Sequence, residues 1–383
     1  MNFEQKSIEL HAIHKGKLEV SSRIAIDNIT QLSIAYSPGV AGPCREIEAD
    51  QSRYAELTSA GNTVAIISDG SAVLGLGNIG AKPSMPVMEG KAVLMKEFAG
   101  LNSFPIVLDT QDTEEIISTI KHIAPSFAAI NIEDISAPRC FEIEERLKKE
   151  LDIPVMHDDQ HGTAIVVLAG IINALKVTNR DDIADVKIVI NGAGAAGIAI
   201  CKLLLTYGAK NIIVCDSQGI ISPDRTNLHS SKKELLLNTN VNKQTGTLID
   251  ALNDADIFIG VSKAHILGEQ EIKVMKPEPI VFALANPIPE IDPAQAHLYG
   301  VAVLATGRSD LPNQVNNVLA FPGIFKGAIK AGVRDIDDKI KIRSAEAIAG
   351  LVDSPQSSQI IPDIFDRRVT EEVARAVEDS VSD

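Results

Sequence analysis

Four carboxylates follow two runs of apolar residues, and their spacing is suited to binding a metal ion. Glu133 and Asp134 come directly after the run FAAINI, and Asp158 and Asp159 come directly after IPVMH. Because the carboxyl ends of parallel strands meet at one edge of a sheet, we expect these acids to converge. Crowded carboxylates need a compensating cation, and oxygen ligands suit a hard divalent ion, so Glu133, Asp134 and Asp159 are the predicted ligands of Mg²⁺ or Mn²⁺. Alternatively the acids cap the following helices, which suits Asp158 in particular.

The glycine spacing G-x-G-x-x-G occurs twice, and its context distinguishes the two copies. The second copy follows the apolar run KIVI and precedes an amphipathic stretch, as in loops that place a pyrophosphate at a helix N-terminus. We therefore predict that this loop binds a dinucleotide rather than forming an idle turn, through Gly192, Gly194, Ala195, Ala196, Gly197 and Ile198. The first copy comprises Gly75, Gly77 and Gly80. Pro83 and Pro86 follow it, so we expect no uninterrupted helix directly behind its glycines.

Asp216 bears on the choice between NAD and NADP. It ends the next predicted strand, near the spacing of roughly 20 residues at which an acid accepts a hydrogen bond from the ribose 2′-hydroxyl. A carboxylate there would repel the 2′-phosphate of NADP. NAD is therefore the predicted cofactor, although a nearby arginine or lysine would reverse this preference and make NADP possible.

Several polar residues lie close to these motifs. Lys91 belongs to a predicted helix that starts at Pro86, where it is either an ordinary surface charge, the more frequent case, or a functional amine. Asn286 ends a later predicted strand, and Asn316 and Asn317 follow the next one. Amides of this kind can bind a carboxylate or a nicotinamide carboxamide, but an asparagine before proline, as at Asn286, is also a routine turn residue.

The elements that must position these residues form two alternating series. The runs TVAII, FPIVL, FAAINI and IPVMH are separated by helix-length stretches, and a second series comprises VKIVI, NIIVCD, DIFIGV, PIVFALA and VAVLAT. Alternation of strands and helices predicts an α/β protein with two parallel sheets. We expect an N-terminal domain over residues 1–160, carrying the acidic cluster. A Rossmann-type dinucleotide-binding domain with C-terminal helices is expected over residues 161–383.

Composition limits the classes of partner. The chain has 383 residues and a formal net charge of −15, which disfavours nucleic acid and anionic membranes as partners. The N-terminus lacks the features of a signal peptide, and the longest apolar run, AIVVLAGIINAL, is too short to span a bilayer. We therefore expect a cytoplasmic protein. The four cysteines lack the C-x-x-C spacing of a zinc or redox site.

Together these motifs resemble the malic enzymes, in particular the short microbial form. The resemblance covers essentially the whole chain and rests on AYSPGVAGPC, SDGSAVLGLGNIG, KPSMPVMEGKAVLMK, NIEDISAPRCFEIE, MHDDQHGTA, NGAGAAGIA and ANPIPE. It implies that Tyr36 and Lys91 are catalytic and that Glu133, Asp134 and Asp159 bind the metal. It also implies that Asn286 and Asn317 contact substrate or cofactor, and that the protein is a homodimer.

The implied reaction converts (S)-malate to pyruvate and CO₂ with reduction of NAD or NADP. In it Lys91 accepts the proton of the 2-hydroxyl group, for which burial and the adjacent cation must lower its pKa from about 10.4 towards neutrality. Tyr36 then protonates C3. Without the resemblance, a tyrosine packed in a proline-rich loop is the simpler interpretation of Tyr36.

The sequence departs from the larger malic enzymes at one place. They carry a Glu-Arg pair after the Asp-Gly of the first glycine-rich loop, and the arginine holds a carboxylate of malate, whereas this chain has Ser71 and Ala72. The distal carboxylate of the substrate therefore needs another partner. A metal-dependent oxaloacetate decarboxylase, a malolactic-type enzyme that retains NAD, and a non-enzymatic NAD-sensing protein are the alternative functions.

Overall fold

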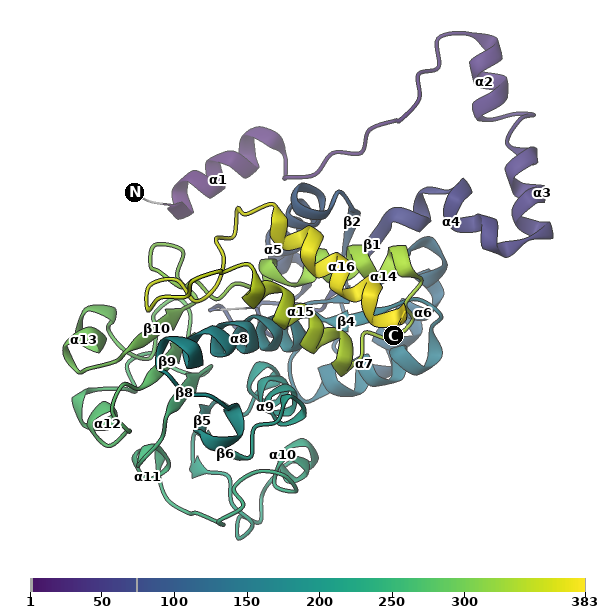
Figure 1. Cartoon of the computed structure of the whole chain (residues 1–383). Helices are drawn as coiled ribbons and strands as arrows, with labels where there is room; N and C mark the ends of the chain where they lie inside the picture. The colour runs from purple at the N-terminus through teal and green to yellow at the C-terminus, as the bar shows by residue number, and fades with distance from the viewer. Residues whose placement is uncertain (1–2, 74, 383) are drawn as a thin grey trace.

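The computed structural model describes residues 3–73 and 75–382, and it contains two sheets flanked by helices (Figure 1). The predicted α/β class is confirmed, because every pair of neighbouring strands is parallel except one short pair at an edge.

The first sheet has the strand order β2-β1-β3-β4. Its strands are β1 (Thr63–Ser68), β2 (Asn102–Val107), β3 (Ala129–Ile132) and β4 (Val155–His157). The helices between them are α5 (Ala81–Leu94), α6 (Thr113–Ile123) and α7 (Arg139–Glu150). A π-helical segment at Met95–Ala99 continues α5, and a 3₁₀ helix at Ala124–Ser126 follows α6. Every residue of β1 and β3 is buried, as expected for a parallel sheet that helices cover on both faces.

The second sheet has the strand order β10-β9-β8-β5-β6-β7. Its strands are β5 (Lys187–Asn191), β6 (Asn211–Asp216), β7 (Gly219–Ile220), β8 (Ile257–Gly260), β9 (Ile280–Ala283) and β10 (Val303–Thr306). Helices α9 (Ala195–Tyr207), α10 (Ser230–Leu235), α11 (Leu248–Leu252), α12 (Glu269–Lys273) and α13 (Pro293–Leu298) connect them, and a short turn at Ile183–Asp185 precedes β5. The antiparallel strand β7 was not predicted, since two residues are too few to show a pattern.

Helix α8 (Asp158–Val177) connects the two sheets and lies in a core that both share. The helix is long and apolar enough to cross a membrane by length and composition, contrary to our expectation, but 72% of its most apolar window is buried inside the protein. Its buried Asn173 donates hydrogen bonds to the carbonyl oxygens of Ala349 (2.9 Å) and Ile360 (3.0 Å). These contacts identify α8 as a core helix.

Three C-terminal helices pack together, namely α14 (Phe321–Ala331), α15 (Asp338–Gly350) and α16 (Arg368–Ser382), and α15 lies against α8 (Figure 1). A short turn at Asn317–Leu319 precedes α14. The packing of α14 against the core brings Phe321 close to the first sheet, where it contacts Lys91.

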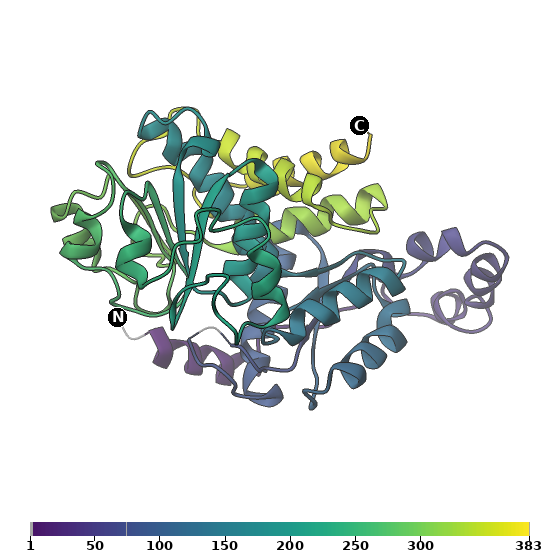
Figure 2. The ribbon, with the colours of Figure 1, turned by 90° about the horizontal axis from the view of Figure 1, so that it is seen from below.

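The N-terminal residues form an arm that extends from the body of the protein. Helices α1 (Phe3–His14), α2 (Ile29–Ala35), α3 (Ala41–Ala49) and α4 (Tyr54–Leu57) contain no buried residue, and short turns occupy Gln51–Arg53 and Ser59–Asn62. In two views, α2 and α3 stand apart from both sheets (Figures 1 and 2). Helix α3 starts within the proline- and glycine-rich residues 35–44, because Pro43 lies in the first helical turn, where no intrahelical N–H bond is needed.

The first glycine copy also differs from expectation. Helix α5 starts at Ala81, directly behind Gly80, and contains Pro83 and Pro86. Pro83 lies in the first turn, where backbone N–H groups have no intrahelical acceptor, so it does not prevent the helix. The prediction that no helix follows these glycines is therefore wrong.

Candidate functional site

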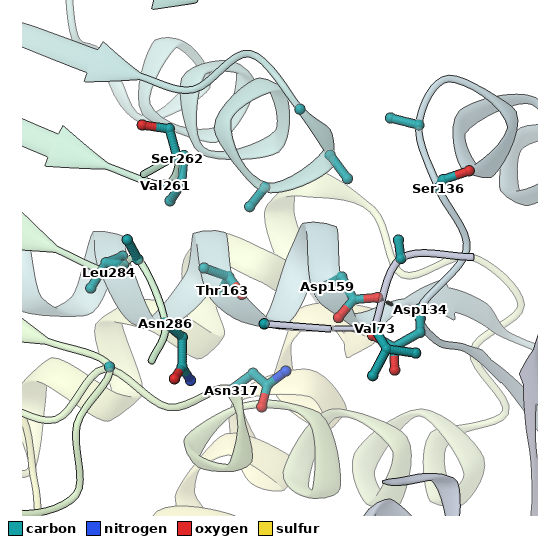
Figure 3. A pocket seen from close by; sticks show the side chains of 18 of the residues that line it. Val73, Asp134, Ser136, Asp159, Thr163, Val261, Ser262, Leu284, Asn286 and Asn317 are labelled. Atoms are coloured by element: carbon teal, nitrogen blue, oxygen red, sulfur yellow. Dashed lines mark hydrogen bonds between the residues drawn. The ribbon is translucent and has the colours of Figure 1, made fainter. Parts of the chain in front are cut away.

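A cleft of about 790 Å³ lies between the two sheets (Figure 3). Its walls come from the loops that follow β1, β3 and β4 on one side and β5, β8, β9 and β10 on the other. The carboxyl ends of the strands of both sheets therefore face one space, as is usual for ligand sites in open α/β sheets.

The second glycine copy has the backbone geometry of a dinucleotide loop. Gly192 has φ +123°, and a Cβ atom there would lie 2.6 Å from the carbonyl oxygen of Val261. A Cβ at Gly197 would lie 1.7 Å from the carbonyl oxygen of Gly192, whereas a Cβ at Gly194 would meet no atom within 4 Å. The first and third glycines thus allow close packing, and Gly194 leaves room for a ligand.

The predicted residues around this loop divide into two groups. Gly194, Ala195 and Ala196 line the cleft, at the start of α9, where free N–H groups favour a phosphate. Ile198 is instead buried in the core, so its side chain serves packing and does not line this cleft.

Asp216 ends β6 as predicted, but its carboxylate is already engaged by this chain. Arg225 binds both oxygens, at 2.9 and 3.0 Å, and Lys232 binds Oδ2 at 2.7 Å. The backbone N–H of Gln218 donates to Oδ1 at 2.9 Å. Although burial opposes the charge, these donors lower the pKa of Asp216 to about 2. All four lone-pair directions of the carboxylate are occupied, and the two cations give the group a net positive charge.

The structure brings the three predicted metal ligands together. One carboxylate oxygen from each of Glu133, Asp134 and Asp159 lies within 4.8 Å of the others. Asp134 has φ +53°, a left-handed conformation that aspartate tolerates, and its backbone N–H donates to Oδ2 of Asp159 at 2.7 Å. Figure 3 shows Asp134 and Asp159 side by side at the wall of the cleft.

The electrostatics of this cluster favour a cation. Burial, with repulsion from Asp159, raises the pKa of Asp134 to about 7, and burial also raises the pKa of Glu133. Oδ2 of Asp134 is buried and has no hydrogen-bond partner among the described residues. Buried, mutually repelling oxygen ligands with a free acceptor fit a divalent metal ion.

Lys91 lies behind this cluster in a buried ionic network. Its Nζ atom is 2.6 Å from Oδ2 of Asp158 and 2.8 Å from Oε1 of Glu133, and it lies 4.4 Å from the centre of the Phe321 ring. Burial alone would lower the pKa of Lys91, but Asp158 and Glu133 outweigh it and hold that pKa above its ordinary value. These contacts alone therefore do not produce the fall towards neutrality, which we expect only with an adjacent cation.

Asp158 has a different role from the helix capping that we considered. It is the first residue of α8, and its fully buried carboxylate accepts hydrogen bonds from Lys91 and, at 2.5 Å, from Nδ2 of Asn317. Asn317 thereby links the cleft wall to Lys91. Asn286 and Asn316 also line the cleft, but the side chain of Asn316 caps the turn before α14 by accepting from the backbone N–H of Val318.

A buried glutamate holds the first turn of α8. Glu144 accepts hydrogen bonds from the backbone N–H of His157 (3.0 Å) and from Gln160 (3.1 Å), and it pairs with His161 at 2.9 Å. His157 Nε2 in turn lies 3.1 Å from Oδ2 of Asp159. His157 therefore contacts the acidic cluster directly, whereas His161 pairs with the glutamate that holds His157.

Tyr36 is not in this cleft. Its side chain is 69% exposed, directly after α2 on the arm. The structure of the single chain therefore separates Tyr36 from Lys91 and from the acidic cluster.

Two residues that contact the site, Glu144 and Phe321, were not predicted from the sequence. Glu144 shares the buried face of amphipathic α7 with Cys140, Ile143 and Leu147, so a carboxylate on an apolar face was an available signal. Phe321 left no such signal, because nothing in a helical apolar pattern shows which side chain will contact a distant lysine.

The chain is similar to known proteins over both of its domains. Residues 15–148 match the family described as malic enzyme, N-terminal domain, and residues 160–382 match malic enzyme, NAD binding domain. The bifunctional malic/malolactic enzyme of Bacillus subtilis is 51% identical over 380 residues, covering 98% of this chain and 92% of that protein. The NAD-dependent malic enzyme of Geobacillus stearothermophilus is 54% identical over 364 residues, covering 94% of this chain and 76% of that protein.

Solved structures agree. The crystal structure of the NAD-dependent malic enzyme from Thermotoga maritima superimposes with a TM-score of 0.94 at 48% identity, covering 97% of this chain and 98% of that one.

Relatives named NADP-dependent also match, among them an Escherichia coli protein that is 44% identical over 395 residues, covering 98% of this chain and 52% of that protein. The names of the relatives therefore include both dinucleotides.

Proposed function

The chain belongs to the malic enzyme family, and from that premise we propose that its cleft converts (S)-malate to pyruvate and CO₂ with reduction of a nicotinamide dinucleotide. This proposal rests on one observation: two functional features face each other across one cleft. On one side lies the acidic cluster, backed by the buried Lys91. On the other side lies the glycine loop that starts α9.

We propose that Glu133, Asp134 and Asp159 hold Mg²⁺ or Mn²⁺. A cation held there would acidify the 2-hydroxyl group of malate, favour the neutral amine of Lys91 and stabilise negative charge on the substrate oxygen. The chain's own contribution is to keep three carboxylates in place through the supports described above. His157 contacts Asp159, and Asn131 donates to Oε2 of Glu133 at 2.8 Å.

Lys91 is proposed to exchange a proton with the 2-hydroxyl oxygen of malate. Asp158 fixes the amine at 2.6 Å and is itself held by Asn317, so the proton is transferred at a defined position. The Phe321 ring closes one side of the amine and excludes water. When CO₂ leaves, the ammonium form of Lys91 is suited to stabilise the enolate oxygen, because it lies in a dry environment where a charge acts strongly.

Tyr36 is proposed to protonate C3 from a second copy of the chain. Supporting this, the arm over residues 18–50 exposes a series of large apolar side chains, namely Leu18, Val20, Ile24, Ile26, Ile29, Leu32, Ile34, Tyr36 and Val40. Apolar side chains exposed in such a series are typical of a surface that another protein covers. A homodimer whose arms exchange would bury them and place Tyr36 in the partner's cleft.

Mixing two inactive variants tests this arrangement. We expect Tyr36→Phe and Lys91→Ala each to be inactive alone, but their co-expressed heterodimer to contain one complete site. Because one of the two sites of each heterodimer is complete, purified heterodimers should recover about half of the wild-type malate-dependent dinucleotide reduction. Purified tagged heterodimers would be assayed, with each homodimer as a control. Recovery of no activity would show that Tyr36 does not act across subunits.

We propose that NAD is the preferred dinucleotide, with a margin that Arg225 and Lys232 keep small. The retained Asp216 supports NAD, whereas the net positive charge of the Asp216–Arg225–Lys232 group supports acceptance of a 2′-phosphate. Removal of Arg225 would free two acceptor positions on Asp216 for the ribose.

Arg225→Ala is therefore expected to shift the ratio of kcat/KM for NAD to kcat/KM for NADP roughly 10-fold towards NAD, since a charged hydrogen bond contributes about 1.5–3 kcal/mol. Steady-state kinetics with each dinucleotide measures this ratio. Lys202→Ala is the control, because it removes a nearby charge that is paired with Glu234. If Lys202→Ala shifts the ratio equally, the loss of any positive charge near the site would explain the change, and Arg225 would have no specific role.

A malolactic reaction is a second candidate, favoured because the Bacillus subtilis relative is named a bifunctional malic/malolactic enzyme. It would convert malate to lactate without releasing reduced dinucleotide.

The cytoplasmic location and the lack of nucleic-acid and membrane partners stay predictions.

Absorbance at 340 nm tests the proposed function. Purified protein would be mixed with malate, Mn²⁺ and either dinucleotide, with a chelator as control, and pyruvate and lactate would be measured at the end. Metal-dependent dinucleotide reduction together with pyruvate supports the proposal. Lactate without reduced dinucleotide would favour the second candidate, and neither product would contradict both.

A further inference from the structure

The proposed reaction leaves one substrate group without a partner. The acidic cluster is suited to the hydroxyl end of malate, but the carboxylate that is lost as CO₂ must also be held, and Ser71 and Ala72 occupy the positions of the larger enzymes' Glu-Arg pair. We propose that the hydroxyl groups of Ser71 and Ser136, oriented by Arg139, bind this distal carboxylate. This inference rests on the proposed function.

The hydrogen bonds of Ser71 leave its proton free for a ligand. Its Oγ atom accepts from the backbone N–H of Ser136 at 2.9 Å and from Nη2 of Arg139 at 3.0 Å. A hydroxyl group has two acceptor positions and one donor, so both acceptor positions are used and the O–H group must donate elsewhere. Ser71 lines the cleft, so an anion there is a suitable acceptor.

Ser136 shares one of these donors. Its Oγ atom accepts from the same Nη2 atom of Arg139 at 3.1 Å, and it too lines the cleft. One guanidinium therefore polarises two hydroxyl groups, which strengthens the hydrogen bonds that they can donate.

Arg139 itself is held in place and does not line the cleft. Its Nη2 atom is 3.0 Å from Oδ2 of the buried Asp69, and Nη1 donates to the carbonyl oxygen of Gln111. Asp69 also accepts from the backbone N–H of Ser71 at 2.9 Å, so one aspartate fixes both the arginine and the loop. Arg139 is thus a positioning residue.

The two hydroxyl groups lie beside the acidic cluster. The backbone N–H of Ala72 donates to the carbonyl oxygen of Asp134 at 2.9 Å, and Ser136 follows Asp134 by two residues. Figure 3 shows Ser136 and Asp134 on the same side of the cleft. A small dicarboxylate with one end at the cluster can therefore place its other end at the serines.

Hydroxyl partners also suit a carboxylate that must leave as neutral CO₂. A direct ion pair would stabilise the charged ground state more than the transition state and would slow the loss of CO₂. Neutral hydroxyl donors bind the distal carboxylate with less stabilisation of its charged ground state. Removal of the donors should therefore raise KM for malate and leave kcat nearly unchanged.

The test compares malate with pyruvate, which lacks the distal carboxylate. For Ser71→Ala and Ser136→Ala we expect KM for malate to rise about 10- to 100-fold, the range for a hydrogen bond to a charged group. The product-inhibition constant of pyruvate should stay within about twofold. Arg139→Gln should resemble the double serine variant, and Arg139→Lys should recover part of the affinity because it retains the charge.

Arg180→Gln is the matched control, since Arg180 pairs with buried Asp256 at 3.2 Å in the second sheet. If Arg139→Gln fails to fold in thermal unfolding, the serine variants decide the question, because they leave the Asp69–Arg139 pair intact. Unchanged KM for malate, or equal losses for malate and pyruvate, would overturn the inference. A wild-type protein that does not turn over malate would instead contradict the proposed function.

Discussion

Replacing Lys91 with alanine is expected to lower malate turnover about 10²- to 10⁴-fold, the usual contribution of a positioned acid or base, while dinucleotide affinity stays unchanged. The reason is that Lys91 is the buried amine between Glu133 and Asp158, whereas the dinucleotide loop lies across the cleft. Turnover would be followed at 340 nm with saturating malate and Mn²⁺, and dinucleotide affinity by calorimetry.

Two further variants separate chemistry from folding. Lys91→Ala leaves two buried carboxylates without their cation, which itself costs stability, so Lys91→Met would be compared to preserve the volume of the side chain. Lys96→Ala, on the same segment but paired with Asn102 at the surface, is the control and should retain turnover. Near-normal turnover in a folded Lys91→Met protein would reject the assignment.

Replacing Asp134 with asparagine is expected to stabilise the protein without metal and to remove its response to metal. The carboxylate is buried, is repelled by Asp159 and has a pKa raised to about 7. A raised carboxyl pKa destabilises the folded state above that pH, and the effect disappears below the unfolded pKa of about 3.9. At pH 8 with chelator we therefore expect a gain of roughly 1–3 kcal/mol, falling to none near pH 4.

Bound metal should reverse the order of stability of the wild type and the Asp134→Asn variant. Saturating Mn²⁺ is expected to raise the thermal midpoint of the wild type by mass action, but to raise that of Asp134→Asn much less. Malate turnover of the variant should fall about 100-fold or more, since charge stabilisation by the ion contributes several kcal/mol. Asparagine also tolerates the left-handed conformation at this position.

Asp256→Asn provides a control of opposite sign. Asp256 is 4% exposed, close to the 3% of Asp134, but Arg180 and Lys276 neutralise it, so its replacement should destabilise the protein at pH 8. An Asp134→Asn protein that keeps the full midpoint shift with Mn²⁺ would show that Asp134 does not bind the ion.

The sequence by itself determined the parts of the molecule that depend on local pattern. Short β-branched runs such as residues 63–68 alternate with helix-length stretches, and this order favours parallel sheets covered on both faces, so both sheets were predictable. The second glycine loop was predictable because its spacing sets close contacts within a strand–turn–helix unit. The convergence of Glu133, Asp134 and Asp159 followed because parallel strands end at one edge.

Only the tertiary structure decided which charged groups pair with the site residues and which residues lie in the cleft. Burial alone would lower the pKa of the Lys91 amine, but its pairing with Asp158 and Glu133 holds that pKa above its ordinary value. Arg225 and Lys232 occupy the carboxylate that was expected to bind the ribose. Tyr36 lies on an arm away from the cleft although its motif belongs to the family pattern. The physical reason is common to all three: a pKa, a free lone pair or a shared site depends on which distant groups meet, and periodicity along a chain carries no information about that.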